Sequence, residues 1–292
     1  MGFRTVCIEN RCKCSYGGGY LVVTKSEVTT RIHLSEISSL AFDTTQVYLS
    51  TQLLAELAKR KIPVIFSSEK HLPIATSLPL HGAYNGAESI ERQLEWTVPS
   101  KKRLWQRVVV DKITRQAEVL SAFDRGDAAA ILKDYAKAVR SGDLDNREAV
   151  AAAAYFPALF GAGFSRDASC EINASLDYGY SIVLSRVANE IASRGYLTQV
   201  GVHHRGKLNP WNLASDLMEP FRPIVDKTVA ESGFEVFDTG VRHRLIALMN
   251  DEVRYADGLY KLSSVIKYYV RDSIAVLERK MLPSELKCYE IT

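Results

Sequence analysis

The densest cluster of side chains able to bind a metal ion lies within residues 201–222. His203 and His204 occupy a loop-like segment. Asp216 and Glu219 follow, three residues apart, so both carboxylates would lie on one helix face. An imidazole together with carboxylates suits a divalent ion, and an oxygen-rich set favours Mg²⁺ or Mn²⁺ over zinc. The alternative is that the histidines are surface residues and the acids solvate a helix. Spacing alone slightly favours that alternative, because such residues are common.

A third carboxylate, Glu148, precedes a run of small apolar residues that predicts a helix buried on most sides. A glutamate at the edge of such a helix is either exposed at the first turn or bound to a partner, because an unpaired buried charge is costly. The competing interpretation is a capping box in which Asp145 is the cap and Glu148 lies three residues later. The residues alone do not distinguish a partner-bound Glu148 from a helix-capping one.

Basic residues near these segments could neutralise the phosphates of a nucleic acid. We expect this role for Arg205 and Lys207, whereas the basic residues between Lys101 and Arg115 are better explained as a solvated helix face. Tyr178 could stack near a nucleic-acid cleft or belong to the core, as aromatic residues at such spacing more often do. The candidate DNA-binding residues are Arg166, Arg186, Arg205, Lys207, Arg222 and Tyr178.

The elements that must position these side chains change character after about residue 78. Before it, strand-like segments flank a glycine-rich hairpin at residues 17–19, and leucines at 53, 54 and 57 predict a short helix. After it, apolar residues recur every three or four positions, as from Trp105 to Leu120 and from Leu262 to Leu277. We therefore predict an α+β fold: a small β-rich domain over 1–78, a linker over 79–90 and a larger all-α domain over 91–292.

Composition narrows the class of protein. The 292 residues are 47% apolar and 24% charged, which is typical of a globular protein of two domains and excludes a disordered or fibrous one. A net charge of +3 excludes a polycation, so nucleic-acid binding would depend on local basic patches. Five cysteines without a C-x-x-C pair predict reduced thiols. With no signal peptide or membrane span evident in the sequence, we expect a cytoplasmic protein that does not bind a membrane.

Four segments of the chain resemble the universal CRISPR-associated integrase, the "Cas one" family, and most of all its type II branch. They are FRTVCIEN near the start, residues 147–161, residues 176–181 and residues 202–223. The segments follow the family's order and extend over nearly the whole length, and the last is long and idiosyncratic. One departure is Asp177, where the family pattern leads us to expect asparagine, and this change could weaken a contact with DNA.

The resemblance implies an N-terminal β domain that forms a homodimer and a helical domain that carries a metal site. The catalytic metal ligands would be Glu148, His204 and Glu219, binding Mg²⁺ or Mn²⁺. His203 is the alternative imidazole. Asp216 would be a neighbouring acid that supports the ligands without binding the ion itself.

The activity that the resemblance implies is phosphodiester transesterification, in which the 3′-hydroxyl of a short DNA duplex (a spacer) attacks a phosphodiester of the CRISPR repeat. The implied partners are DNA, a second copy of the chain and a small "Cas two" protein that bridges two dimers. Hydrolysis at the same site would instead make the chain a metal-dependent DNA nuclease. A non-catalytic DNA-binding scaffold is the remaining alternative, and the complete set of Glu148, His204 and Glu219 argues against it.

Overall fold

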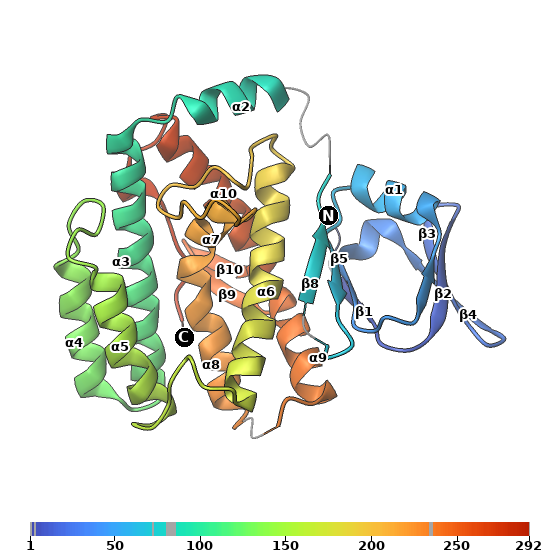
Figure 1. Ribbon diagram of the computed structural model, residues 1–292, viewed down its shortest axis with the longest axis horizontal. Coiled ribbons are helices and arrows are strands. Elements are labelled where there is room, and N and C mark those ends of the chain that lie inside the picture. Colours follow the sequence, from blue (N-terminus) through green and yellow to red (C-terminus); the bar gives the residue numbers. More distant parts are fainter. Residues whose placement is uncertain (1, 3, 72, 80–85, 234–235, 292) are drawn as a thin grey trace.

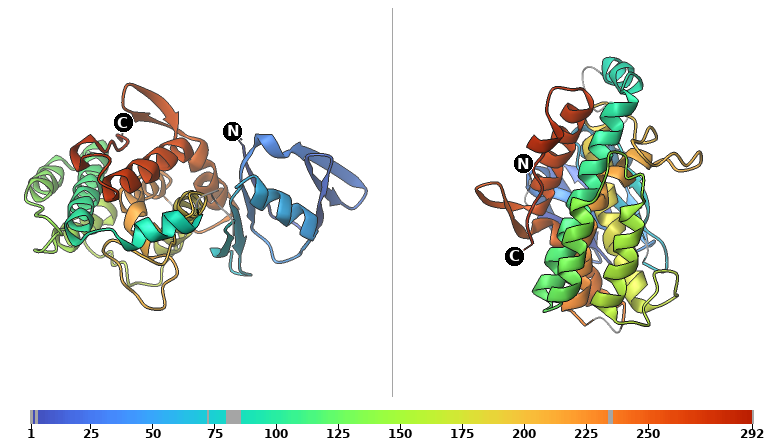
Figure 2. Two further views of the ribbon diagram at one scale, coloured as in Figure 1. Left: turned by 90° about the horizontal axis from the view of Figure 1, so that it is seen from above. Right: turned by 90° about the vertical axis from the view of Figure 1, so that its left-hand side faces the viewer.

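The structure, a computed structural model, describes residues 2, 4–71, 73–79, 86–233 and 236–291. Within these residues the N-terminal part consists of two four-stranded sheets and a helix, and the rest is mostly helical (Figure 1). The two parts lie side by side (Figure 2). The predicted α+β class, with a small β-rich part before a larger helical part, is confirmed.

The β-rich part encloses its own core between the two sheets. One sheet has the order β1 (Arg4–Ile8), β5 (Ile37–Phe42), β7 (Val64–Ser67) and β8 (Pro73–Ser77). The other has the order β4 (Val28–His33), β3 (Tyr20–Lys25), β2 (Cys12–Gly17) and β6 (Val47–Leu49). The predicted hairpin joins β2 to β3, and Gly18 and Gly19 there adopt positive φ angles of 57° and 92°. The predicted short helix is α1 (Thr51–Lys59), which buries Leu53 and Leu57 in this core.

The helical part is built around two long helices. Its helices are α2 (Gly86–Leu94), α3 (Val98–Ala122), α4 (Gly126–Lys137), α5 (Arg147–Phe160), α6 (Glu171–Ala192), α7 (Asn212–Met218), α8 (Arg222–Glu231), α9 (Thr239–Ala247) and α10 (Leu262–Leu277). Thr97 caps α3 by accepting a hydrogen bond from the backbone N–H of Ser100, and Pro99 fits its first turn. The predicted apolar stripes of α3 and α10 are buried as expected, and they pack into one core.

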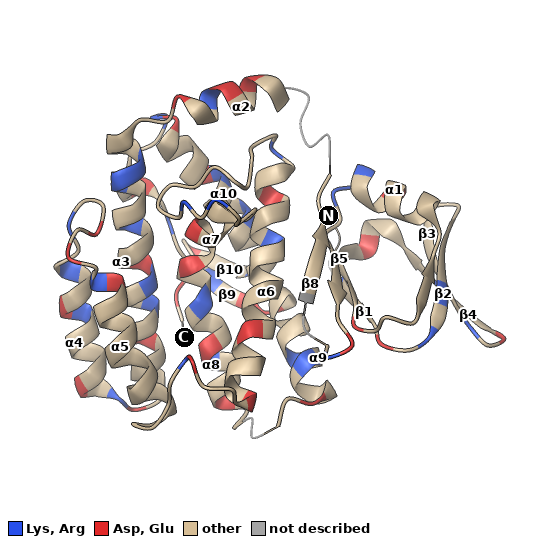
Figure 3. Cartoon of the chain, in the orientation of Figure 1, with Lys and Arg blue, Asp and Glu red and all other residues tan. Residues whose placement is uncertain are grey.

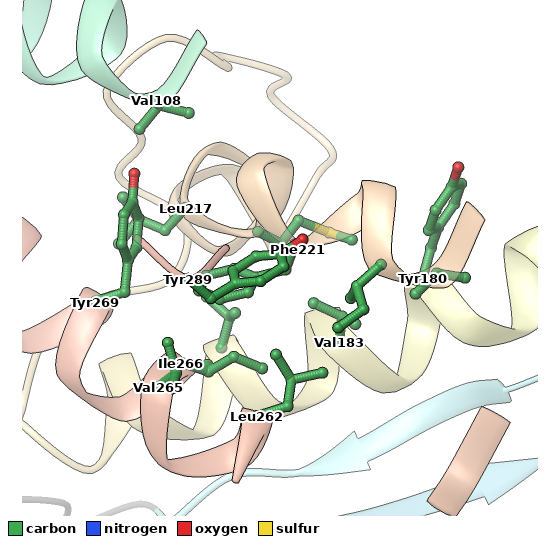
Figure 4. Close-up of a cluster of buried hydrophobic side chains, with 14 of the residues drawn as sticks. Val108, Tyr180, Val183, Leu217, Phe221, Leu262, Val265, Ile266, Tyr269 and Tyr289 are labelled. Atoms are coloured by element: carbon green, nitrogen blue, oxygen red, sulfur yellow. The ribbon is translucent and has the colours of Figure 1, made fainter. Parts of the chain in front are cut away.

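The core of the helical part is aromatic at its centre (Figure 4). Phe221 stacks on Tyr289 with ring centroids 5.5 Å apart and meets the edge of Tyr269 at 5.3 Å. Phe221 ends the 3₁₀ turn η2 (Glu219–Phe221), which links α7 to α8. This buried ring therefore anchors the turn that carries Glu219.

Two details differ from the sequence prediction. A hairpin of β9 (Glu252–Tyr255) and β10 (Gly258–Lys261) interrupts the part that was predicted to be all-α. Strands of four residues are too short to show an alternation against the helical pattern around them. Helix α2 begins at Gly86, within the predicted linker 79–90, whereas residues 80–85 lie outside the described residues. The domain bounds themselves remain a prediction. Among the described helices, none is long and apolar enough to cross a membrane.

Candidate metal and DNA site

Glu148 lies in the first turn of α5, and another residue caps that helix. The carboxylate of Asp143 accepts hydrogen bonds from the backbone N–H groups of Arg147 at 2.8 Å and Glu148 at 3.1 Å. Asp145 instead forms an ion pair with Arg140 at the surface. The capping box of Asp145 and Glu148 is therefore wrong, and the side chain of Glu148 is free to face α3.

The side chain that Glu148 meets is Lys112, which comes from the middle of α3. Its Nζ donates to Oε1 of Glu148 at 2.7 Å and to Oε2 of Glu219 at 2.5 Å. One ammonium group thus joins two carboxylates that lie 71 positions apart in the sequence. Lys112 is only 7% exposed, and Arg115 is also buried and pairs with Glu118. The prediction of a solvated helix face is wrong for these two residues.

Glu219 is buried and is surrounded by positive charge. Besides Lys112, the guanidinium of Arg222 lies 3.0 Å from Oε1 of Glu219. Burial by itself raises the pKa of this carboxyl, but Arg222 and Lys112 outweigh it and hold the pKa of Glu219 below its usual value. Glu219 is therefore an anion at neutral pH, as a metal ligand must be.

His204 is oriented by Asp216, which is fully buried. The carboxylate of Asp216 accepts hydrogen bonds from the backbone N–H groups of Val202, His203 and His204, and Oδ1 lies 2.7 Å from Nδ1 of His204. This bond is the main cause of the raised pKa of His204, to which the charges of the nearby Glu219 and Glu148 contribute further. Because Nδ1 is engaged, Nε2 is the ring nitrogen available to a ligand.

The neighbouring His203 is arranged differently. Its ring stacks face to face on Trp105 with the centroids 4.1 Å apart. The turn that starts at Gly201 and carries the two histidines is tight: a Cβ at Gly201 would come within 2.4 Å of the carbonyl oxygen of His204. A side chain at Gly201 would therefore displace His204. The structure places His204, and not His203, beside the acids.

As the side chains stand, no three His, Cys, Asp or Glu residues within the described ranges form a cluster able to hold a metal ion. The ammonium of Lys112 takes the position between the carboxylates of Glu148 and Glu219. The donor set nevertheless suits a divalent ion. Two carboxylates already converge on one cation, and an imidazole fixed through Nδ1 by a buried carboxylate is the usual form of a histidine ligand.

Next to His204, a cavity of about 520 Å³ has three lysine and arginine side chains and no carboxylate in its lining. Arg205 and Lys207, the residues predicted to bind phosphate, contribute to it, and so does Lys101 from α3, which the sequence prediction assigned to a solvated face. Burial, and after it the charge of Arg205, lowers the pKa of Lys101. Elsewhere acidic and basic residues are intermixed, as along α2 and α4 (Figure 3). This cavity therefore gathers positive charge in a way that the overall charge of the chain does not reveal.

The remaining candidates for DNA binding separate into two groups. Arg222, which pairs with Glu219, and Arg166 both lie over the ring of Tyr180, at 4.7 and 5.4 Å from its centroid. Arg166 also forms an ion pair with Asp177 at 2.6 Å. Asp177, the residue that departs from the family pattern, therefore has a partner within the chain.

Two candidates do not reach this region, which corrects the prediction for them. Tyr178 is only 1% exposed and packs against Phe237, because it faces the core side of α6. Arg186 is largely buried and pairs with Glu190 one turn later on the same helix. Tyr178 is not accessible to DNA, and Arg186 lines a different cavity, beside Ser193 and Lys267. Helical spacing alone did not reveal which residues of α6 point inward.

Comparison of the sequence with known proteins gives matches to a single family. The family model described as "CRISPR associated protein Cas1" matches residues 6–232. The chain is 36% identical over 229 residues to the CRISPR-associated endonuclease Cas1 of Neisseria meningitidis serogroup C, with 78% of this chain and 75% of that protein covered. It is 29% identical over 238 residues to a CRISPR-associated endonuclease Cas1 of Thermus thermophilus, covering 71% and 73% respectively.

Solved structures share the fold at lower identity. A casposase bound to its integration product matches with a TM-score of 0.74 and 20% identity, over 97% of this chain and 92% of that one. The Cas1 protein of Thermotoga maritima matches with a TM-score of 0.70 and 16% identity, over 94% and 97%. A chain of a Cas6-RT-Cas1–Cas2 complex matches with a TM-score of 0.74 and 17% identity, and this chain spans 36% of its length. At these identities the matches show a common fold.

Proposed function

Because the chain belongs to the CRISPR-associated Cas1 family, we propose that it is a metal-dependent DNA integrase that inserts short duplexes into a CRISPR array. One observation carries this proposal most strongly: Glu148 and Glu219 converge on a single cation beside a histidine oriented by a buried acid. The curated relatives are called endonucleases, and a structural neighbour is a casposase bound to an integration product. Both descriptions concern phosphodiester chemistry on DNA.

The reaction is an exchange of phosphodiester bonds. The 3′-oxygen of the incoming duplex bonds to a phosphorus of the repeat, and the bond from that phosphorus to the 3′-oxygen of the repeat strand breaks. One bond forms and one breaks, so no nucleotide cofactor is required. Such a transfer depends on positioning and electrostatics more than on a side-chain nucleophile.

Glu148, Glu219 and Nε2 of His204 are the groups that would hold Mg²⁺ or Mn²⁺. When bound, the ion would lower the pKa of the attacking hydroxyl and neutralise charge on the phosphate. Asp216 keeps Nε2 of His204 available by engaging Nδ1. Arg222 adds a fixed positive charge next to Glu219, where the phosphate charge develops.

We further propose that the basic cavity beside His204 binds the DNA backbone. Lys101, Arg205 and Lys207 line it, and each can neutralise a phosphate. Arg166 and Arg222 would extend this contact past Tyr180. Structural neighbours include chains of Cas1–Cas2 assemblies and of a Cas1–DNA complex. The partners proposed for this chain are accordingly DNA, a second copy and a small Cas2-type protein.

A joining assay tests this function. The protein, its Cas2-type partner, a short duplex and a repeat-bearing plasmid are incubated with Mn²⁺, with and without EDTA. We expect joined product only with free Mn²⁺, no product from a duplex whose strands lack 3′-hydroxyls, and DNA binding that persists in EDTA. Cleaved plasmid without joining would identify a hydrolytic nuclease instead. DNA binding with neither cleavage nor joining would identify a scaffold, and either result would contradict the proposal.

A further inference from the structure

Lys112 lies at the centre of the proposed metal site although lysine is not a metal ligand in such sites. It projects from the middle of α3 between α5, which carries Glu148, and the turn η2, which carries Glu219. Its ammonium lies 2.7 and 2.5 Å from oxygens of the two carboxylates. A lysine buried to this degree is stable only when it is paired, and here both partners are the residues proposed to bind the metal.

Without Lys112, the two carboxylates would face each other in a largely buried setting. Like charges held close together in low dielectric repel each other strongly. Lys112 offsets this repulsion for Glu148 and Glu219, while Arg222 binds the other oxygen of Glu219. The four groups carry two negative and two positive charges, so the arrangement is electrically balanced as it stands.

A divalent ion that binds Glu148 and Glu219 would add two positive charges to this balanced group. The position between the two carboxylates is the one that the Lys112 ammonium now occupies, where it donates to Oε1 of Glu148 and Oε2 of Glu219. A carboxylate has acceptor sites enough for two partners, but two cations held in one position repel each other. The ion and the Lys112 ammonium therefore compete for the space between the two acids.

We propose that Lys112 is a positioning residue that holds Glu148 and Glu219 together before the metal arrives and competes with the metal for the space between them. This inference rests on the proposed function, because it assumes that those two acids bind the ion. It predicts two opposite effects of removing the charge. The metal-free protein loses stability, and its affinity for metal rises.

The test compares the full-length wild type with Lys112→Met, and Lys102→Met serves as the matched control. Lys102 lies on the same helix, but its side chain packs beside Gly142 and is exposed. Two quantities are measured: the melting temperature in EDTA, and the Kd for Mn²⁺ by calorimetry or by the electron paramagnetic resonance of free Mn²⁺. For Lys112→Met we expect a melting temperature lower by several degrees in EDTA and a Kd at least tenfold lower. For Lys102→Met we expect wild-type values.

A second variant, Lys112→Gln, covers the case in which methionine prevents folding. Glutamine has no charge but can still donate hydrogen bonds to a carboxylate, so it should fold and also bind Mn²⁺ more tightly than the wild type. Mn²⁺ binding by folded Lys112 variants that is equal to or weaker than wild-type binding would overturn the inference and leave the proposed function intact. Absence of Mn²⁺ binding from the wild type and both variants would overturn the proposed metal site itself. Binding by the variants alone would support a strong competition by Lys112.

Discussion

At the scale of single residues, the two adjacent histidines have different surroundings. Nδ1 of His204 is bound to Asp216, and the ring lies near Glu148 and Glu219, whereas His203 stacks on Trp105. The backbone positions are neighbours, but the turn closed by Asp216 directs the two rings differently. Spacing could not distinguish the two histidines, and the hydrogen bonds of one buried carboxylate give them different orientations.

The first prediction concerns this pair. His204→Ala should lower the joining rate at least 100-fold, because it removes the imidazole ligand, while the free energy of unfolding changes by about 1 kcal/mol or less for a partly exposed side chain. His203→Ala is the matched control and should retain joining within a few fold. Joining rates and urea unfolding of both variants provide the measurement. If His203→Ala is the inactive variant, the assignment within the pair is reversed.

A second residue, Asp226, makes stability depend on pH. It is buried on α8 and accepts a hydrogen bond from the hydroxyl of Tyr180. Burial raises its pKa to about 6, although Tyr180 and Arg222 oppose the shift. An aspartate in the unfolded chain titrates near ~3.9. The proton is therefore held more tightly in the folded state, and the stability this contributes is present below about pH 4 and is lost as pH rises through about 6.

The corresponding prediction uses Asp226→Asn, which keeps the shape and the acceptor for Tyr180 but does not titrate. Relative to the wild type, the variant should gain about 1 to 3 kcal/mol of unfolding free energy between pH 4 and pH 7, from a shift of roughly two pH units. Urea unfolding at both pH values measures this difference. Asp111, whose pKa burial also raises to about 6, stays in both proteins and so cancels from the comparison. Equal changes in the two proteins would show that Asp226 does not titrate in this range.

At the scale of elements, helix α5 is held in place by a residue four positions before its start. Asp143 has a φ angle of +49° and accepts from the first two backbone N–H groups of the helix, Arg147 and Glu148. Asn146, at the N-cap position, also has a positive φ angle, of 50°. This left-handed turn sets the direction in which α5 presents Glu148 to α3.

We predict that Asp143→Ala lowers the free energy of unfolding by about 1 to 2 kcal/mol, because it removes the cap and leaves alanine at a left-handed φ angle. Asp145→Ala is the control, since it removes only an exposed ion pair with Arg140 and should leave the free energy of unfolding close to that of the wild type. Both values come from chemical denaturation followed by circular dichroism. Equal losses in the two variants would mean that Asp143 does not cap the helix.

At the scale of the whole molecule, the β-rich part leaves strand edges and apolar side chains exposed. Strand β4 is an edge of its sheet, and Val28 at its start is 69% exposed. Edge strands of this kind are often covered by a symmetric copy. Together with family membership, this supports the expectation that two chains pair through their β domains.

The prediction is a dimer mass in sedimentation at micromolar concentration. Val28→Glu should increase the fraction of monomer, because it adds a charge at the edge that we expect to be covered. Val236→Glu changes an equally exposed valine, 63% accessible, in the helical part and should leave the dimer unchanged. A monomer mass for the wild type would reject pairing through this surface, and equal effects of both substitutions would reject the location.

From the amino-acid sequence it was possible to predict a β-rich part before a helical part, the apolar stripes of two helices and the family. Residues such as Trp105, Val109 and Ile113 repeat with the period of a helix, and a helix must bury that face wherever it packs. The resemblance to the family also indicated Glu148, His204 and Glu219 as candidate metal ligands. These features can be predicted from the sequence because each depends on a local period or on a contiguous run of residues.

Which charged and aromatic residues are buried could be seen only once the helices were packed together. Lys112 and Arg115 looked like a solvated face, but α3 is packed on several sides, so charged positions outside its apolar stripe are buried as well. Tyr178 and Arg186 were assigned to DNA, but the packing of α6 buries Tyr178, and Arg186 pairs with Glu190 on the same helix. Local periodicity cannot report how many neighbours surround a helix, because those neighbours come from distant parts of the chain. The pairing of Lys112 with Glu148 and Glu219 depends on such contacts alone.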